Sequence, residues 1–419
     1  MSKNFKLPLF KSKREIFFAL SFLSVIFLLS LYFEYRSFET LKSKRFYTTK
    51  AFVLNQYIKK RKRREYFVLK LKSDEGYTFY TTNYEDLKNI KNRKIRITLI
   101  TKKISFFDFL RGFYAPSFDI RLYPKENDIK SSLFDFITSQ HQKEQFKELF
   151  SALFLAEPIS KTLRQKVQFL GISHLIAISG FHLGVLFFIF YQIFGRIYRF
   201  FQDRYFPYRN RRLDLSIFTG VILFGYMYML DFVPSLLRSF VMMCVGFFFY
   251  ARGIRVVSFT TLFTTVLIIL SLFPKLLFSI GFWFSVSGVF YIFLFLHYFK
   301  DLNPKMIFVF LNFWVFFMMI PIVHLFFPVF SFYQLLSPIL SMLFVVFYPL
   351  ELFLHGIGFG GVLDPFIEKL LDINGEIFYF QTDILYFVGF ALLSIFSIFH
   401  RVFLVILSFS LLFYPVYIS

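Results

Sequence analysis

The feature that most constrains this chain is a series of long apolar runs. The first reads IFFALSFLSVIFLLSLYF at residues 16–33, and comparable runs recur from residue 172 onward. A bilayer-spanning helix needs about 20 mostly apolar residues. Hydrophobic residues make up 57% of the 419 residues, which exceeds the roughly 45–50% of a soluble domain. The sequence therefore predicts a mainly α-helical, polytopic membrane protein. It excludes a cytosolic globular enzyme, a disordered chain and, with Cys244 as its one cysteine, a disulfide scaffold.

About ten transmembrane helices are expected, of which the run at 16–33 is the first. The others are expected near residues 172–195, 215–230, 235–250, 257–273, 276–298, 306–327, 329–354, 384–399 and 402–417. Basic clusters follow alternate expected spans, and short basic loops normally stay in the cytoplasm. We therefore expect residues 1–40 to form a basic cytoplasmic tail followed by the first span.

A different pattern follows the first span. The net charge of the chain is +22, and residues 1–130 carry 29 Lys and Arg against 12 Asp and Glu. Apolar residues alternate with polar ones in FVLKL at 67–71, KIRITL at 94–99 and FDIRL at 118–122, which is typical of half-buried strands. About five short strands suit a small closed barrel, of which the OB-fold often binds oligonucleotides. We expect an all-β, OB-like barrel at residues 41–125, outside the membrane on the periplasmic side.

An uninterrupted basic run lies between the first and second expected strands. It consists of Lys59, Lys60, Arg61, Lys62, Arg63 and Arg64. In an OB-fold this position is the first hairpin loop, which is one of the loops that contact nucleic acid. Six adjacent cations predict a salt-dependent attraction for phosphates, in DNA or in anionic lipid headgroups. A solvated hairpin tip is the remaining interpretation.

Residues 126–166 have mixed polarity. Phe146, Leu149, Phe150 and Leu153 recur at helical spacing among charged residues. This spacing predicts an amphipathic helix that lies at the membrane interface rather than crossing it. We expect it to lead into the membrane domain, residues 167–419.

The densest group of polar residues within an apolar run is GISHLIAISGFHLG, residues 171–184. On one continuous helix, Ser173, Ala177, Gly180 and Gly184 would form a stripe of small residues that lets another backbone approach closely. Polar side chains at membrane depth usually face the interior of a helix bundle or a wet path.

Two histidines lie in the same segment. His174 and His182 are eight residues apart, and Ser179 lies three residues before His182 on a shared helical face. Helix packing with the imidazoles bonded to backbone carbonyls is one interpretation, and a functional path is the other. A metal site is not expected, because two histidines without an adjacent carboxylate or cysteine lack the necessary ligands.

This segment resembles the signature of the ComEC family of bacterial competence proteins, which are inner-membrane channels for DNA uptake. The similarity covers LFLAEPISKTLRQKVQFLGISHLIAISGFHLGVL at residues 153–186. The matching fixed positions are Gly171, Ser173, His174, Leu175, Ala177, Ile178, Ser179, Gly180 and His182. Three later blocks resemble the family in the same order, through Ser235, Arg238 and Ser239, then Gly281, Phe282, Phe284 and Ser285, then Pro338 and Pro349.

The resemblance implies a channel that carries single-stranded DNA across the bacterial inner membrane during natural transformation. The implied partners are single-stranded DNA, a periplasmic DNA-receptor protein, a cytoplasmic ATPase or helicase motor, membrane lipid and a second copy of the chain in a homodimer. No enzymatic activity, cofactor or metal is expected. The residues expected along the DNA path are Gly171, Ser173, His174, Ser179, Gly180, His182, Gly184, Ser235, Arg238, Trp283 and Ser285.

The chain also departs from the family pattern. Many members end in a metallo-β-lactamase-like domain with a His-x-His-x-Asp-His zinc motif, which this sequence lacks, so we expect a short member without that domain. The Asn of the family's late helix is replaced by Leu340-Ser341, and no role of that Asn is carried over. The glycine-rich segment at 356–361 lacks the Lys-Ser/Thr of a phosphate-binding loop. Conduction is therefore expected to be passive.

Arg238 has two interpretations. It lies near the start of an expected span, where it could extend to lipid headgroups or pair with Asp231. Alternatively, it contacts a phosphate at the mouth of the channel.

Two other classes of function compete with the channel. A small-molecule or lipid transporter would also have a polar site within the membrane. An intramembrane hydrolase would use Ser179 as nucleophile and His182 as base, but no orienting carboxylate or oxyanion hole is apparent in the sequence.

Overall fold

The protein is described by a computed structural model that covers residues 8–61, 64–83, 90, 93–124, 129–412 and 414. The chain divides into two compact units, which we describe separately. The sheet unit comprises Phe10–Ser131 and Val266–Ser279. The helical unit comprises Ser132–Thr265 and Ile280–Ser419.

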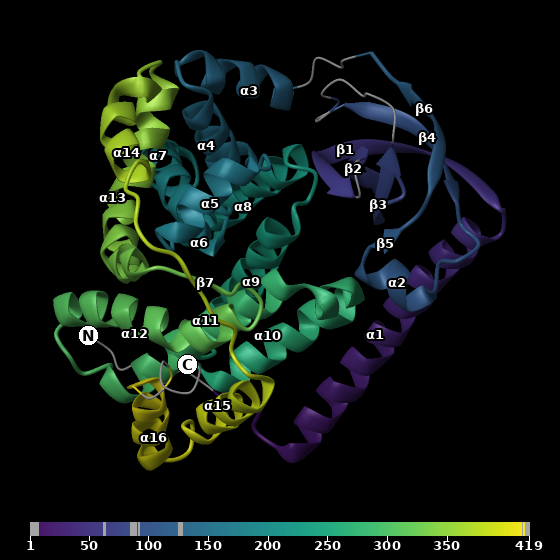
Figure 1. The fold of residues 1–419 in the computed structure, drawn as a ribbon. Helices are drawn as coiled ribbons and strands as arrows, with labels where there is room; N and C mark the ends of the chain where they lie inside the picture. Colours follow the sequence, from purple (N-terminus) through teal and green to yellow (C-terminus); the bar gives the residue numbers. More distant parts are fainter. Residues whose placement is uncertain are drawn as a thin grey trace. The chain divides into compact units, whose positions relative to one another are not determined.

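The sheet unit begins with a long helix, α1 (Lys13–Lys42) (Figure 1). Its N-cap is Ser12, whose side chain accepts a hydrogen bond from the backbone N–H of Glu15, as is usual for serine at a helix start. Most of the helix is apolar and exposed, whereas Phe38 and Leu41 near its end are buried in the core of the sheet unit. The first expected span is therefore confirmed as a helix long and apolar enough to cross a membrane.

Six strands follow α1 in one sheet, with the order β5-β3-β2-β1-β4-β6. They are β1 (Phe46–Arg61), β2 (Arg64–Ser73), β3 (Thr78–Asn83), β4 (Lys94–Ile100), β5 (Phe113–Tyr114) and β6 (Ser117–Leu122). The three alternating motifs of the sequence lie in β2, β4 and β6. Because side chains alternate between the faces of a strand, Leu69 and Leu71 of β2 and Ile95 and Ile97 of β4 enter one buried core.

The expected closed barrel is not formed. Strand β5 is only two residues long and pairs in parallel with Phe79 and Tyr80 of β3, while β6 pairs with β4 at the opposite edge. No backbone pairing joins β5 to β6 among the described residues, so the sheet remains open. A two-residue strand offers too few backbone groups to close a barrel.

A distant segment of the chain completes the sheet unit. The short helix η1 (Pro274–Phe278) packs against α2 (Phe106–Arg111), where the rings of Phe107 and Phe278 lie 4.9 Å apart. Lys275 also forms an ion pair of 2.7 Å with Glu34 of α1. The sheet unit is thus built from two stretches of sequence that are more than 130 residues apart.

The helical unit contains a series of helices, one of which, α10, continues from Val266 into the sheet unit. They are α3 (Ile129–Ser139), α4 (Glu144–Leu155), α5 (Lys161–Phe169), α6 (Ser173–Ile176), α7 (Gly180–Tyr205), α8 (Arg211–Met229), α9 (Pro234–Ala251), α10 (Phe259–Leu272), α11 (Ile280–Phe299), α12 (Pro304–His324), η2 (Phe332–Leu336), α13 (Ser337–Gly356), η3 (Gly360–Leu363), α14 (Asp364–Leu371), α15 (Ile384–Phe396) and α16 (Arg401–Leu412). Two short strands, β7 (Val329–Phe330) and β8 (Phe378–Tyr379), pair with each other. Helix α4 buries the expected apolar face, including Phe146 and Phe150.

Ten membrane spans are not confirmed. Within the described residues, five helices are long and apolar enough to cross a membrane. They are α1, α7, α11, α12 and the segment Phe332–Gly356, which contains α13. Four further apolar helices are shorter. The run expected at 257–273, for example, gives α10 with 14 residues, or about 21 Å of helix, because Pro274 starts a separate 3₁₀ turn.

The helical unit has two cores. The larger one joins buried residues of α4 to α9 with those of α13 and α14, which gather in one part of the ribbon (Figure 1). The smaller one joins α11, α12, α15 and α16, and there the Tyr291 hydroxyl bonds to Ser394 at 2.9 Å. The motif at residues 171–184 lies in the larger core.

Candidate functional site

The motif at residues 171–184 is a broken helix. We expected one continuous helix over 172–195, but α6 ends at Ile176, residues 177–179 are extended, and α7 begins at Gly180. The side chain of Ser179 caps α7 by accepting a hydrogen bond from the N–H of Phe181 (3.3 Å). A capping serine has extended backbone dihedrals and ends the regular helix before it. The prediction that the small residues form one stripe on a single continuous helix is therefore wrong.

His182 completes this cap. Its Nδ1 accepts a hydrogen bond from the backbone N–H of Ser179 at 3.1 Å, in the position that Glu or Gln usually takes in a capping box. The imidazole is buried against the rings of Tyr348 and Phe344, with centroids 4.6 and 5.5 Å away. In a neutral imidazole whose Nδ1 accepts, Nε2 carries the proton. This buried Nε2 makes no well-formed hydrogen bond in the part of the chain that the structure describes, although the backbone of Leu175 interacts with the imidazole.

His174 approaches the same helix, α13, from the other side of the break. Its Nε2 lies 3.1 Å from the hydroxyl of Ser341, and the side chain is accessible. The two histidines of the motif therefore reach α13 one after the other, at Ser341 and at Tyr348. Ser173, the first residue of α6, is exposed, and its carbonyl accepts a hydrogen bond from Ala177.

The glycines of the motif have different surroundings. Gly171 has φ +69°, and a Cβ there would lie 3.2 Å from the side chain of Gln334, so only glycine allows this turn to lie against η2. A Cβ at Gly180 would meet the Ser239 hydroxyl of α9 at 3.5 Å. Gly184 faces open space, with nothing within 4 Å of its Cβ position.

Arg238 lies in α9, next to the contact between Ser239 and Gly180. The residue is 7% exposed. No hydrogen bond or ion pair joins its guanidinium to any residue of the described ranges, and its Nε is fully buried. Ser239 itself bonds back to the carbonyl of Ser235 at 2.9 Å. A buried cation without a partner is costly, by several kcal/mol after relaxation.

The N-termini of α7 and α9 add partial positive charge to that of the Arg238 guanidinium. Helices α7 and α9 are in contact, and Gly180 and Ser239 lie near their respective starts. The N-terminus of a helix carries about half a positive charge and free backbone N–H groups. Arg238, the His182 Nε2–H group and the two helix starts therefore provide donors without a matching carboxylate in the described structure.

Some predicted site residues lie elsewhere. Trp283 and Ser285 are on α11, where the Trp283 ring contacts Phe282 with centroids 5.3 Å apart. In the basic run, Lys60 and Arg61 end β1, and Arg61 pairs with Arg64 at the start of β2. The run is thus largely strand rather than loop. Lys62 and Arg63 lie outside the described residues.

Sequence reasoning missed the contribution of α13. Its buried residues Phe344, Tyr348, Glu351 and His355 are spaced by four, three and four, which places them on one helical face. Tyr348 covers His182, and Ser337 at the start of the helix donates to the carbonyl of Gly171 at 2.9 Å. The spacing was visible in the sequence as a stripe with a carboxyl and an imidazole in an apolar run.

Comparison with known proteins identifies the family. A family model described as competence protein matches residues 156–418, which include the α6–α7 break, Arg238 and α13. No curated protein and no solved structure matches the chain. Because the matched range is more than half of the chain, this protein belongs to the competence protein family.

Proposed function

We propose that this protein is a channel that passes single-stranded DNA across the bacterial inner membrane during natural transformation. Membership of the competence family suggests a role in DNA uptake, and several apolar helices suggest a membrane protein. The alternative of a small-molecule or lipid transporter has no observation of its own in its favour.

The observation that carries the proposal is the unpaired guanidinium of Arg238. A DNA strand brings one negative phosphate per nucleotide, and arginine binds phosphate through two parallel N–H donors. A passing phosphate would neutralise the buried cation that no described carboxylate neutralises. Because each phosphate is replaced by the next one, the contact favours passage rather than permanent binding.

Neighbouring groups fit the same ligand. The Nε2–H of His182 is a neutral donor, and the ring of Phe181 is 37% exposed at the start of α7. Bases of single strands stack on exposed aromatic rings without regard to sequence. Donors for phosphates and a ring for bases therefore lie on consecutive residues.

The sheet unit would collect the DNA before it enters. Lysines lie over aromatic rings at its surface, with Lys59 5.8 Å from the Tyr57 ring and Lys70 5.8 Å from the Tyr80 ring. Such cation and ring pairs suit a strand with charged backbone and flat bases. We place this unit in the periplasm, with a cytoplasmic N-terminus, and propose that a periplasmic receptor delivers DNA to it.

We propose passive conduction without catalysis. The Ser179 hydroxyl lies 3.1 Å from His182 Nδ1, but the hydroxyl already caps α7, and the His182 Nε2 contacts no carboxylate among the described residues. A nucleophilic serine needs a base that a third group orients. A cytoplasmic ATPase or helicase would therefore pull the strand, and a homodimer remains a proposal for the assembly.

A matched pair of arginines tests the proposal. Arg238→Gln and Arg252→Gln change the two ends of α9, and Arg252 is exposed. In a DNA-uptake assay with radiolabelled DNA, Arg238→Gln should lower cytoplasmic entry about tenfold or more, because a hydrogen bond to a charged group contributes about 1.5–3 kcal/mol. DNase-protected periplasmic DNA should remain. Arg252→Gln should behave like the unmodified protein.

Protein levels in the membrane are measured in parallel. Wild-type entry of DNA in the Arg238→Gln strain, with normal amounts of protein, would contradict the proposed role of Arg238. Loss of both the periplasmic and the cytoplasmic pools would place the defect before the channel.

A further inference from the structure

Four titratable side chains meet near the C-terminal end of α13. They are Glu351 and His355 of α13, His141 of the α3–α4 connection, and Asp364 of α14. Glu351 and His141 are essentially inaccessible, whereas the Asp364 side chain is 15% exposed. The group therefore runs from the surface into a helix that is long and apolar enough to span a membrane.

The four groups are spaced at hydrogen-bond distances. Asp364 lies 3.0 Å from His141 Nδ1, and His141 Nε2 lies 3.0 Å from His355 Nε2. His355 Nδ1 is 2.8 Å from the backbone oxygen of Glu351 and 3.1 Å from its carboxyl Oε2. Each imidazole thus has one nitrogen toward a carboxyl group and the other toward its partner imidazole.

Glu351 is the unusual member. It is 0% exposed, and within the described ranges neither of its carboxyl oxygens makes a hydrogen bond. A buried carboxylate in this condition is costly unless a proton or a cation neutralises it. A small rotation of the carboxyl group would turn Oε2 toward His355 Nδ1. Functional hydrogen bonds are often long or poorly aligned in structures without a bound ligand.

The surroundings exclude water from the histidine pair. The His141 ring stacks on Phe150 with centroids 4.5 Å apart and a 4° angle, and the His355 ring meets Phe154 at 4.9 Å. Burial lowers the pKa of His141, although its hydrogen bond to Asp364 opposes this shift. The neutral imidazole is thereby favoured, and a neutral imidazole both donates and accepts a hydrogen bond.

The glycine-rich segment at 356–361 packs closely against the imidazole of His355. A Cβ at Gly360 would lie 2.6 Å from His355 Nε2, and a Cβ at Gly361 would lie 2.6 Å from the carbonyl oxygen of Gln140. Gln140 holds the segment by accepting from the Gly360 N–H at 2.7 Å and donating to the His355 carbonyl at 3.2 Å. Glycine is therefore required at Gly360 for the backbone to cover the imidazoles.

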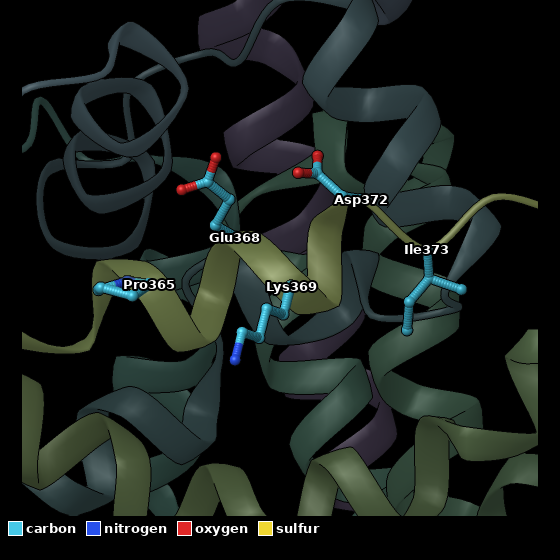
Figure 2. A pocket seen from close by; sticks show the side chains of 5 residues that line it. All are labelled: Pro365, Glu368, Lys369, Asp372 and Ile373. Carbon is cyan, nitrogen blue, oxygen red and sulfur yellow. The ribbon is translucent and has the colours of Figure 1, made fainter.

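Helix α14 fixes the surface end of the group. Asp364, Glu368 and Asp372 are four residues apart and form pairs with His141, Lys143 and Lys166. Figure 2 shows the carboxyl groups of Glu368 and Asp372 on one side of α14, with Lys369 on the other. Both lysine pairs are partly exposed and contribute little stability, and Asp364 itself is held by its 3.0 Å contact with His141.

We propose that Asp364, His141 and His355 form a proton relay that loads and unloads Glu351 within α13. Three protons are shared by the four groups. In the form that matches the His355 Nδ1–H bond to the backbone oxygen of Glu351, His355 Nε2 accepts from His141 Nε2–H, His141 Nδ1 accepts from a protonated Asp364, and Glu351 is ionised. When each proton moves by one hydrogen bond, His355 gives its Nδ1 proton to Glu351, His141 gives its Nε2 proton to His355, and Asp364 gives its proton to His141, so Glu351 becomes protonated and Asp364 ionised while both imidazoles end neutral. The four groups together keep the same net charge, and only the position of the negative charge changes, from one carboxyl group to the other.

The remaining titratable groups nearby do not interrupt this path. Tyr348 lies one turn before Glu351 on α13, the Lys147–Glu144 pair lies on α4, and the Lys143–Glu368 pair joins the N-cap of α4 to α14. Intramembrane carboxyl and histidine groups commonly mark proton relays. This inference does not depend on the identity of the cargo, and it gives α13, which contacts His174 and His182, a proton-dependent state.

The test uses infrared spectroscopy of the full chain in lipid vesicles. Carbonyl stretching bands of protonated carboxyl groups are recorded as the pH is changed, and one of these bands should disappear in Glu351→Gln. Glu157→Gln is the matched control, because Glu157 is also buried but lies outside the four groups. In Glu157→Gln the assigned band should remain.

Transfer from H₂O to D₂O distinguishes a relay from an isolated protonated carboxyl group. The band should shift quickly in the unmodified protein. It should shift about tenfold or more slowly in His355→Gln and in Asp364→Asn, because exchange then needs local opening of the structure. The absence of a band that depends on Glu351, or equally fast exchange in Asp364→Asn, would overturn the proposal. If His355→Gln does not fold, Asp364→Asn at the exposed end still decides between the outcomes.

Discussion

The sheet unit and the helical unit differ in how a buried arginine is paired. In the sheet unit, Arg93 is half-buried and donates through one Nη to the carbonyl of Tyr123 at 2.9 Å, although its Nε has no partner among the described residues. In the helical unit, Arg238 is buried without such a partner among the described residues. All seven histidines of the chain also follow residue 131, so none belongs to the 10–131 stretch of the sheet unit. The imidazoles and the arginine without a described partner therefore lie in the helical unit.

The largest expected effect tests whether the two units are stable independently. Phe79→Ala removes a fully buried ring that stacks on Phe113 at 5.7 Å in the sheet core. It should cost the sheet unit about 3–5 kcal/mol of unfolding free energy. Hydrogen exchange measured by mass spectrometry should become faster in residues 46–83 and stay unchanged in residues 180–205.

The exposed Phe118 provides the control, because Phe118→Ala should leave exchange in both units close to that of the unmodified protein. Equal loss of protection in both regions after Phe79→Ala would show that the units fold as one, and the comparison would then fail.

A smaller effect is expected from the glycine segment of the helical unit. Gly360→Ala forces a Cβ toward the His355 ring and should destabilise the helical unit by about 1–3 kcal/mol. Gly356→Ala is the control, because nothing lies within 4 Å of its Cβ position. Thermal unfolding in detergent should separate the two variants. Equal melting temperatures would mean that the cover over the imidazoles is not tightly packed.

The smallest expected effect is a pH dependence confined to the helical unit. Burial lowers the pKa of His141 below its value in the unfolded chain, so this residue stabilises the folded state above about pH 6.5, and the stabilisation is lost as the pH falls. The loss is at most about 1.4 kcal/mol per pH unit for one proton. Hydrogen exchange of residues 144–155 should become faster between pH 7.5 and 5.5 after correction for intrinsic exchange. An identical change in residues 46–83 would argue against His141 as the cause.

Local patterns predicted the elements better than their assembly. Period-two alternation correctly placed strands at 67–71, 94–99 and 118–122, and helical spacing correctly placed α4. Closure of a barrel depends on pairing between distant strands, and the two-residue length of β5 has no signature in a period-two pattern. The open sheet therefore could not be read from the alternation.

The candidate site shows the same limit. The motif at 171–184 located His174 and His182, but Ser179 within an apolar run has the same composition whether it packs inside a helix or caps a new one. In the site, His174 contacts Ser341, which is 167 residues away in sequence, and in the group of four titratable side chains His141 contacts Asp364, which is 223 residues away. Such contacts follow from tertiary packing, so residue spacing alone did not reveal them.

The second segment of the sheet unit has a consequence for the order of synthesis. Lys275 and Phe278, which contact Glu34 and Phe107, leave the ribosome only after residues 132–265 have been made. Domains generally fold in the order in which they are translated, but this unit cannot reach its final contacts before α7 to α9 exist. A nascent chain that stops before residue 274 would therefore lack both the Lys275–Glu34 ion pair and the contact between Phe278 and Phe107.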